Sequence, residues 1–285
     1  MCRLFGMSAG TRRARATFWL LQAPDSLVVQ SHREPDGTGL GWFGEKGEPH
    51  VAKRPIAAFD DRAFAREAKE VESQTFIAHI RFASTGALEM RNTHPFEQDG
   101  RLFAHNGVIE DLPKLEAHLG DDLSLVRGDT DSERFFALIT REIRIHDDLA
   151  EGILRACEWV AENLPVFAMN FVLATRDELL ALRYPETHEL YVLERAAGGE
   201  LEHESGFGTR VVSKHGSKHP LVTIASERMD DDPGWRLLES GELLNVRATL
   251  EATSTRPLDA PPAHPLTIDD LHGRAKSSQA AKPSA

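Results

Sequence analysis

The order of strand and helix signals along the chain is the feature that most restricts how it can fold. From residue 166 onward the sequence contains five successive strand-like segments joined by short turns (166–175, 179–184, 190–194, 208–213 and 221–226). The predicted helices, in contrast, are grouped in the first 165 residues. A parallel α/β sheet would require strands and helices to alternate, so this order favours antiparallel sheets covered by helices. We therefore expect an α+β fold.

The first 165 residues supply the other predicted elements. Predicted strands cover residues 2–8, 40–43, 50–53, 75–82 and 101–104, and predicted helices cover residues 11–22, 61–72, 112–119, 130–145 and 149–162. Thr130 is a suitable cap for the fourth of these helices, with Glu133 at the capping-box position. Cys157 lies on the apolar stripe of the last helix, and we interpret it as a core residue.

The end of the chain has a different composition. From about Glu251 it is rich in Thr, Ser, Pro and Ala and contains few large apolar residues. Such a segment cannot bury enough apolar surface to offset the entropy lost on ordering it, so we expect residues 251–285 to be mostly disordered. The predicted folded domain therefore spans residues 1–250.

Composition excludes several classes of protein. The chain has 285 residues, of which 41% are hydrophobic and 27% charged, which is ordinary for a globular protein. Its longest apolar runs are far too short to span a bilayer, and no signal segment is recognisable at its start. The net charge of -12 argues against sequence-independent nucleic-acid binding. With two cysteines and no signal segment, we expect a cytoplasmic protein without a disulfide framework.

Cys2 is chemically suggestive because it directly follows Met1. Removal of the initiator methionine would leave a thiol and a free α-amine on the same residue. The thiol could then attack a substrate while the amine, with a reference pKa of about 8, takes up its proton. The alternative is that Cys2 is a small buried apolar residue at the start of the first strand.

A second candidate group follows the predicted strand 75–82. This strand contains Arg81, and Ser84 and Thr85 come directly after it. An arginine at a strand end can hold a carboxylate through two charge-assisted hydrogen bonds. A surface ion pair is the alternative, and it is the commoner role of a single arginine.

The dipeptide Asn106-Gly107 follows the predicted strand 101–104. An amide side chain and a glycine N–H that converge on one point can form an oxyanion hole. Asn-Gly is also the standard dipeptide of a tight turn, and the dipeptide alone favours the turn.

Asp131 stands at the predicted start of a helix. It could accept hydrogen bonds from a substrate ammonium group, or it could serve only to cap the helix and balance its dipole. His79, His94 and His105 raise the question of a zinc site, but they lack helical i,i+4 spacing and no carboxylate pattern completes a ligand set. We expect no metal, and we interpret His79 and His105 as hydrogen-bonded residues beneath the site.

Taken in order, these segments resemble the class II glutamine amidotransferase family of the N-terminal-nucleophile hydrolase superfamily. The resemblance is carried by Cys2 after Met1, the run from His79 to Gly86, the run from Asn92 to Phe96, His105-Asn106-Gly107, and Thr130 to Glu133. The chain is similar in particular to stand-alone members without a synthase domain. The resemblance is sharpest over residues 1–135, extends to about residue 250 and does not cover the tail.

The resemblance implies a four-layer αββα fold with two stacked antiparallel sheets and no cofactor. It implies that Cys2 attacks the side-chain amide of glutamine, which gives a γ-glutamyl thioester and ammonia, and that water then releases glutamate. By the same resemblance, Arg81 binds the substrate α-carboxylate and Asp131 its α-ammonium. Asn106 and the N–H of Gly107 hold the oxyanion.

The resemblance gives other residues less defined roles. Ser84 and Thr85 fall in the substrate-binding run, and Arg33 and Asp36 resemble a turn that orients the nucleophile. Some members of the wider family carry Trp where this chain has Phe82. The apolar wall is kept there, but an N–H donor is lost.

Three functions remain open on the sequence alone. The leading one is a glutamine amidotransferase that releases ammonia, with the acceptor bound elsewhere, for example by a partner protein. The second is a γ-glutamyl amidohydrolase that acts on a γ-glutamyl conjugate through the same site. The third is a non-catalytic binding module, which no sequence feature supports. In the first two cases we expect a small-molecule substrate and neither nucleic acid nor membrane as a partner.

Overall fold

The computed structural model describes residues 1–197, 201–204, 210–213 and 219–279. Its strands are β1 (Arg3–Ser8), β2 (Gly37–Phe43), β3 (Pro49–Arg54), β4 (Thr75–Arg81), β5 (Phe96–Gln98), β6 (Arg101–Ile109), β7 (Pro165–Ala174), β8 (Glu178–Arg183), β9 (Tyr191–Arg195), β10 (Leu201–Glu204), β11 (Arg210–Ser213), β12 (Leu221–Ala225), β13 (Arg236–Leu237), β14 (Glu242–Arg247), β15 (Ala252–Thr255) and β16 (His264–Pro265). Its α-helices are α1 (Leu27–Gln30), α2 (Arg62–Glu70), α3 (Leu112–Leu119), α4 (Asp131–His146), α5 (Leu149–Asn163) and α6 (Gly273–Gln279).

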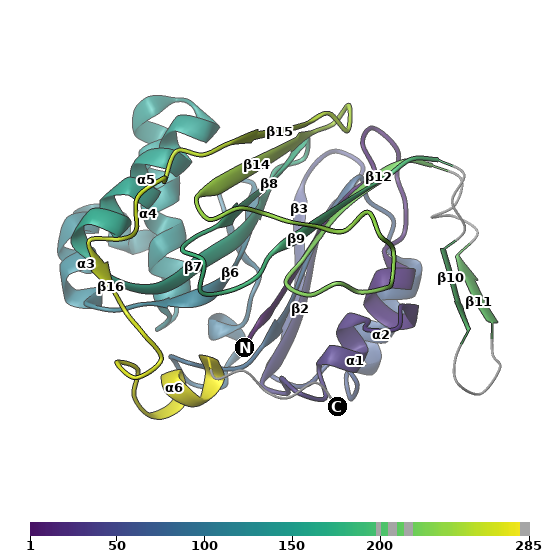
Figure 1. Cartoon of the computed structure of the whole chain (residues 1–285), viewed down its shortest axis with the longest axis horizontal. Coiled ribbons are helices and arrows are strands. Elements are labelled where there is room, and N and C mark those ends of the chain that lie inside the picture. Colours follow the sequence, from purple (N-terminus) through teal and green to yellow (C-terminus); the bar gives the residue numbers. More distant parts are fainter. Residues whose placement is uncertain (198–200, 205–209, 214–218, 280–285) are drawn as a thin grey trace.

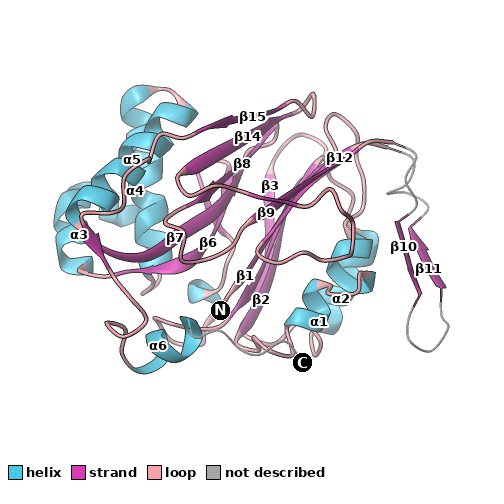
Figure 2. Ribbon diagram, in the orientation of Figure 1, coloured by secondary structure: helices cyan, strands magenta, loops and turns pink. Residues whose placement is uncertain are grey.

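Two sheets form the centre of the molecule (Figure 2). The first has the strand order β13-β9-β12-β1-β4-β2-β3, and the second has the order β15-β14-β8-β7-β6-β5, with β16 added alongside β7. The ladders within both sheets are antiparallel except for the short pairing of β16 with β7. Helices α3, α4 and α5 cover the second sheet and helices α1 and α2 cover the first (Figure 1). The predicted four-layer αββα arrangement is confirmed.

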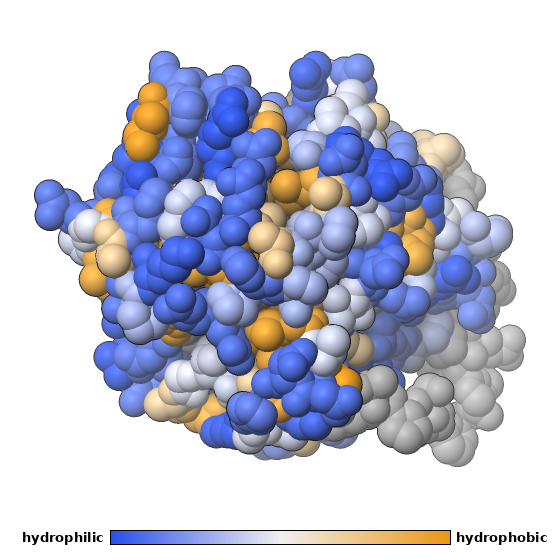
Figure 3. Space-filling view, turned by 60° about the vertical axis from the view of Figure 1, so that its left-hand side comes forward, coloured by the Kyte–Doolittle hydropathy of each residue, from blue (hydrophilic) through white to orange (hydrophobic). Residues whose placement is uncertain are grey.

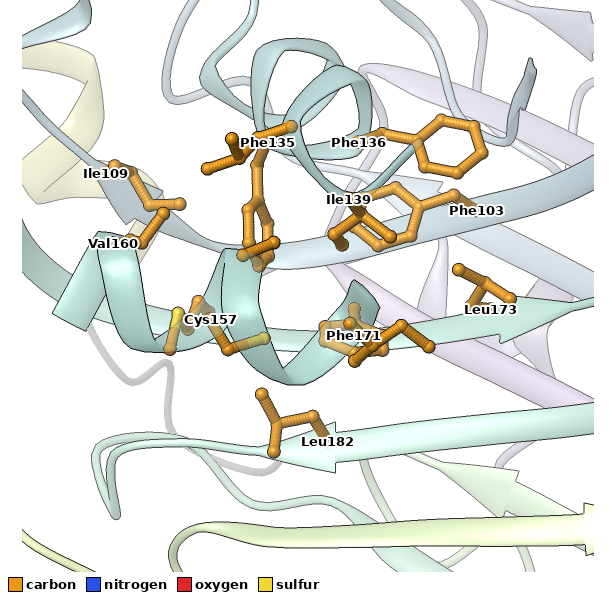
Figure 4. Close-up of a cluster of buried hydrophobic side chains, with 14 of the residues drawn as sticks. Phe103, Ile109, Phe135, Phe136, Ile139, Cys157, Val160, Phe171, Leu173 and Leu182 are labelled. Carbon is orange, nitrogen blue, oxygen red and sulfur yellow. The ribbon is translucent and has the colours of Figure 1, made fainter. Parts of the chain in front are cut away.

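Apolar side chains fill the three spaces between these layers. Leu4, Ile77 and Val172 belong to the cluster between the two sheets. Cys157 lies in the cluster between the second sheet and helices α4 and α5, together with Phe135 and Phe171 (Figure 4). Burial raises the pKa of the Cys157 thiol, so this cysteine fills the core as predicted.

Local sequence signals fix several helix ends. The Asp61 carboxylate caps α2 by accepting the N–H groups of Ala63 and Phe64 at 3.0 and 3.1 Å. The Thr130 hydroxyl caps α4 by accepting the Glu133 N–H at 3.3 Å. The Glu133 carboxylate, however, accepts the N–H of Gly128 at 2.6 Å. The hydroxyl half of the capping box therefore forms, whereas the carboxylate is used by Gly128.

The predicted helix over residues 11–22 is mostly absent. Residues Phe18–Gln22 form a π-helical turn, whereas Ala14 makes a β-bridge with Ser73. The chain around Ala14 is extended. The apolar residues that suggested a longer helix are nevertheless buried, against the outer face of the first sheet. Tertiary pairing therefore overrides the local periodicity here.

Strand β6 differs from its predicted extent. It does not end at residue 104 but continues to Ile109, with Asn106 opposite Asn170 and Gly107 opposite Met169. A Cβ atom at Gly107 would lie 1.8 Å from the carbonyl oxygen of Ala168. The glycine thus permits close contact with β7, and the tight-turn interpretation of Asn106-Gly107 is wrong.

The structure also differs from the expected disordered tail. Strand β15 pairs with β14, and Leu271 is fully buried against Val108 and Phe167. Helix α6 then lies near the N-terminus (Figure 1). The average composition of a segment does not show where its apolar residues lie. A few of them at the right positions are enough to anchor it. Residues 280–285 lie outside the described part of the chain.

Among the described residues, no helix is both long and apolar enough to cross a bilayer. The face seen in Figure 3 is mainly hydrophilic, with small and separate apolar groups. Such scattered apolar residues are normal on the surface of a globular protein.

Candidate active site

Cys2 stands at the start of β1, beside the end of β4. Its sulfur lies 3.3 Å from both the N–H and the carbonyl oxygen of Phe82, and the residue is only 8% exposed. Burial raises the pKa of the Cys2 thiol. The Phe82 N–H, the N-terminal ammonium and Arg81 act in the opposite direction because each stabilises a thiolate.

Met1 is present, so the nitrogen of Cys2 is part of a peptide bond. The N-terminal ammonium of Met1 lies 3.2 Å from Oε1 of Glu34. Nη1 of Arg3 donates to the carbonyl oxygens of Met1 and Cys2 at 2.8 and 3.2 Å. Burial lowers the pKa of the N-terminal amine, and Glu34 opposes this shift.

Arg81 is buried at the end of β4, next to the nucleophile candidate. Its guanidinium donates to the carbonyl oxygens of Thr85 and Ala87 at 2.6 and 3.0 Å. It forms no ion pair with any described residue, so the surface salt bridge is wrong as an interpretation of Arg81. Burial lowers the pKa of Arg81, while the charges of Cys2, Asp36 and Asp131 raise it.

Asp131 is the first residue of α4 and is also buried. One of its carboxylate oxygens accepts the Thr85 hydroxyl at 3.1 Å, and the other accepts the N–H of Ile109 at 3.0 Å. Thr85 therefore connects the two charged residues, because its carbonyl binds Arg81 and its hydroxyl binds Asp131. Ser84 is half-buried in the same loop.

Asn106 lies in the middle of β6 and is 2% exposed. Its Oδ1 atom has no hydrogen-bond partner in the described part of the chain. Asn106 lines an open cavity of about 340 Å³ together with Met1 and Arg3. The other walls come from the loop after β8 and the residues after β12 (Arg183, Glu186, Thr187, His188, Glu189, Ser226 and Glu227).

The predicted supporting residues have separate positions. Asp36 accepts the N–H of Ala83 at 2.9 Å and so holds the chain directly after β4. Arg33 binds Glu227 at 2.8 Å, and Glu227 binds Arg3 at 2.5 Å. Arg33 is thus linked to the nucleophile region through these two residues.

The three central histidines are buried and differ in their contacts. Nδ1 of His105 lies 2.9 Å from the Ser132 hydroxyl, as a hydrogen-bonded residue should. The His79 ring packs on His94 with centroids 4.1 Å apart, and neither of its nitrogens meets a described partner of good geometry. Burial lowers the pKa of His79 to about 3, so its ring is neutral. Among the described residues, no group of His, Cys, Asp or Glu is arranged to hold a metal ion.

Sequence reasoning missed three polar residues around Cys2. Glu34 and Arg3 are buried beside the N-terminus, and Asn170 is buried opposite Asn106. A signal was available for Arg3, because a charged residue inside an apolar strand needs a buried partner. Glu34 and Asn170 had no comparable signal, since their positions depend on long-range pairing.

Comparisons with known proteins show the family of the chain. The model of the family "Glutamine amidotransferases class-II" matches residues 1–265. The gamma-glutamyl-hercynylcysteine sulfoxide hydrolase of Mycolicibacterium smegmatis is 28% identical over 80% of this chain and 88% of that relative.

Solved structures show the same fold. A glutamine aminotransferase class-II domain protein from Silicibacter pomeroyi superposes with a TM-score of 0.59 at 18% identity, over 90% of this chain and 99% of that one. The glutamine phosphoribosylpyrophosphate amidotransferase of B. subtilis gives 0.62 at 19% identity, over 91% of this chain and 50% of that chain. The matched region covers nearly the whole sequence, and the chain belongs to the class II glutamine amidotransferase family of enzymes.

Proposed function

We propose that Cys2, once Met1 is removed, is the nucleophile that hydrolyses the side-chain amide of glutamine. The observation that carries this proposal is the position of Thr85, which binds both Arg81 and Asp131. Thr85 thus holds the buried guanidinium and the buried carboxylate together beside the thiol. Free glutamine has a carboxylate and an ammonium on its α-carbon, so Arg81 and Asp131 match both charged groups.

The proposed reaction proceeds through a covalent intermediate. The thiol proton passes to the α-amine of Cys2, and the sulfur attacks the amide carbon of the substrate. Collapse of the tetrahedral intermediate breaks the carbon–nitrogen bond, and the leaving nitrogen takes the proton back from the ammonium. Ammonia and a γ-glutamyl thioester result, and water then hydrolyses the thioester to glutamate and the free thiol.

Asn106 and Gly107 supply the proposed oxyanion donors. Both belong to β6 and pair with β7, which fixes their positions. A preorganised donor of this kind lowers the barrier by roughly 3 kcal/mol. In this proposal Phe82 and Ser84 line the substrate, while Arg33 and Asp36 hold the surrounding loops in place.

A γ-glutamyl amidohydrolase is the second candidate. The open cavity of about 340 Å³ beside Asn106 is much larger than a departing ammonia requires, so a bulkier amine could occupy it. The Mycolicibacterium smegmatis relative, by its name, is a hydrolase of a γ-glutamyl compound. Both functions use the same nucleophile and the same clamp on the glutamyl group.

One experiment separates these functions. Glutamate release is measured from glutamine and from a panel of γ-glutamyl amides, after intact-mass analysis has confirmed that Met1 is absent. Glutamine turnover supports the first function, and a strong preference for a bulky γ-glutamyl amide supports the second. Cys2→Ser should abolish both activities, with Cys157→Ser as the matched control that retains them. No turnover of any substrate by the processed protein would refute both.

We also propose a cytoplasmic location, supported by two free cysteines and the absence of a disulfide among the described residues. The catalytic unit is proposed to extend beyond the predicted boundary at residue 250, because Leu271 packs on β6 and β7 and the family model matches residues 1–265. If the ammonia is transferred rather than released, a separate partner protein is the proposed source of the acceptor site.

A further inference from the structure

Glu34 is a buried carboxylate that the proposed mechanism has not yet used. Its side chain is 1% exposed, and its Oε1 atom contacts the N-terminal ammonium and Nη2 of Arg3 at 3.2 and 3.5 Å. Its Oε2 atom is buried and has no hydrogen-bond partner in the described chain. Leaving a buried carboxylate oxygen without a donor is costly, so a donor is expected to reach it in the functional form.

The ion pairs around Glu34 balance in charge only when the N-terminal ammonium is counted. Arg3 binds Glu34 and Glu227, and Arg33 binds Glu227 and Asp25. Within the described chain, three carboxylates thus face two guanidinium groups, and the N-terminal ammonium is the third cation. Burial, with a contribution from Glu227, raises the pKa of Asp25 to about 6.

Removal of Met1 transfers this ammonium to Cys2. The new amine lies one residue further along the backbone, roughly 3.5 Å from the old one. Nη1 of Arg3 already binds the carbonyl oxygen of Cys2 and would keep that residue in place. The new amine of Cys2 would then be a hydrogen-bond donor in the region of the unpartnered Oε2 atom of Glu34.

We propose that Glu34 anchors the α-amine of Cys2 in the processed enzyme by accepting a hydrogen bond from it on Oε2. This inference rests on the proposed function of Cys2. Glu34 is a positioning residue, because it acts through the amine and does not touch the substrate. It gains and loses no proton: the thiol proton moves to the amine, and the amine later returns it to the leaving nitrogen.

The anchor also sets the charge of the amine. The charged groups that face the present N-terminal amine of Met1 are Glu34, Cys2 and Arg3, and in this proposal the amine of Cys2 lies among the same groups. Glu34 and a Cys2 thiolate favour the ammonium, whereas Arg3 opposes it. Replacing Glu34 by a neutral residue should therefore release the proton at lower pH.

The test compares Glu34→Gln with Glu34→Asp and with Glu45→Gln, an exposed site in the turn between β2 and β3. Intact mass first confirms loss of Met1 in each protein. In Glu34→Gln, kcat for glutamate release should fall about tenfold while KM changes little, because the glutamyl clamp is intact. The mechanism needs the amine unprotonated, so the acidic limb of the pH profile should move down by about one unit. Glu34→Asp keeps the carboxylate and should show a smaller shift. Glu45→Gln should match the wild type.

A second readout does not depend on turnover. Labelling with ¹⁵N-cysteine gives signals from Cys2 and Cys157 alone, and of these only the amine of Cys2 titrates. Its pKa should be about one unit lower in Glu34→Gln than in the wild type. An unchanged amine pKa overturns the anchor even if the enzyme is active. A lowered amine pKa in a protein that hydrolyses no substrate supports the anchor and rejects the proposed function.

Discussion

Gly107 shows how one residue can meet a structural and a chemical demand. Its backbone must approach Ala168 closely, because a Cβ atom there would lie 1.8 Å from the Ala168 carbonyl oxygen. The same N–H is a proposed oxyanion donor. We therefore expect any side chain at this position to damage the fold before it affects chemistry.

Gly107→Ala should lower the free energy of unfolding by about 2 to 4 kcal/mol, because β6 and β7 must separate to admit the methyl group. Urea denaturation measures the loss. Gly100→Ala is the control, since no atom lies within 4 Å of a Cβ there and only its φ of +75° is unfavourable. The control should cost about 1 kcal/mol. Equal losses in the two variants would contradict the steric argument.

Arg81 is the residue on which substrate affinity should depend most. Its guanidinium is buried without an ionic partner among the described residues, next to Cys2. In Arg81→Ala, KM for glutamine should rise at least tenfold, because a charge-assisted pair to the α-carboxylate is lost. Steady-state kinetics measures this, with the exposed Arg66→Ala as control. An unchanged KM would show that another group binds the carboxylate.

Among the elements, the C-terminal segment was the least expected. Leu271 is fully buried with Val108, Phe167 and Ala168. Beyond it, Arg274 contacts Asp36 at 3.3 Å and Gln279 contacts His188 at 2.6 Å. The segment therefore joins the outside of β6 and β7 to two loops at the candidate site.

Leu271→Ala should lower the free energy of unfolding by about 2 to 3 kcal/mol, because a fully buried leucine is removed from a packed cluster. Leu237→Ala makes the same change at a side chain that is 38% exposed, and it should cost well under about 1 kcal/mol. Denaturation curves of both variants give the comparison. A mobile tail would instead make Leu271→Ala as mild as the control.

At the scale of the whole molecule, buried histidines link stability to pH. Burial lowers the pKa of His188 to about 4 and that of His79 to about 3, and it also lowers those of His94 and His105. Below about pH 6.5 the unfolded chain binds protons that the folded chain excludes. The stability that these neutral histidines contribute is therefore complete above this pH. It is lost as the pH falls toward their pKa values in the folded state.

Each buried histidine should remove roughly 1 kcal/mol of stability per pH unit within this window. Urea denaturation at about pH 7.5 and about pH 5 should thus show a marked loss. His188→Gln should reduce the slope by one histidine's share, whereas His50→Gln, at an exposed site, should leave it unchanged. A stability independent of pH in this range would rule out the linkage.

The sequence by itself determined most of the elements and indicated the candidate site residues. Asp61, Thr130 and the apolar stripe around Cys157 act locally, so their helices could be placed without a structure. The order of strands and helices determined the two-sheet architecture, because strand segments that follow one another through short turns pair as antiparallel neighbours. Cys2, Arg81, Asn106 and Asp131 were found as motifs.

Only the tertiary structure decided how these residues meet. Strand β6 continues through Asn106 because β7 pairs with it, and no local signal distinguishes this from a turn. Glu34 lies beside Cys2 because the chain entering β2 passes the start of β1, and both strands pair with β4. The tail is ordered because Leu271 finds an apolar surface already built by β6 and β7. Each of these outcomes depends on contacts between residues distant in sequence, which local propensity and composition do not contain.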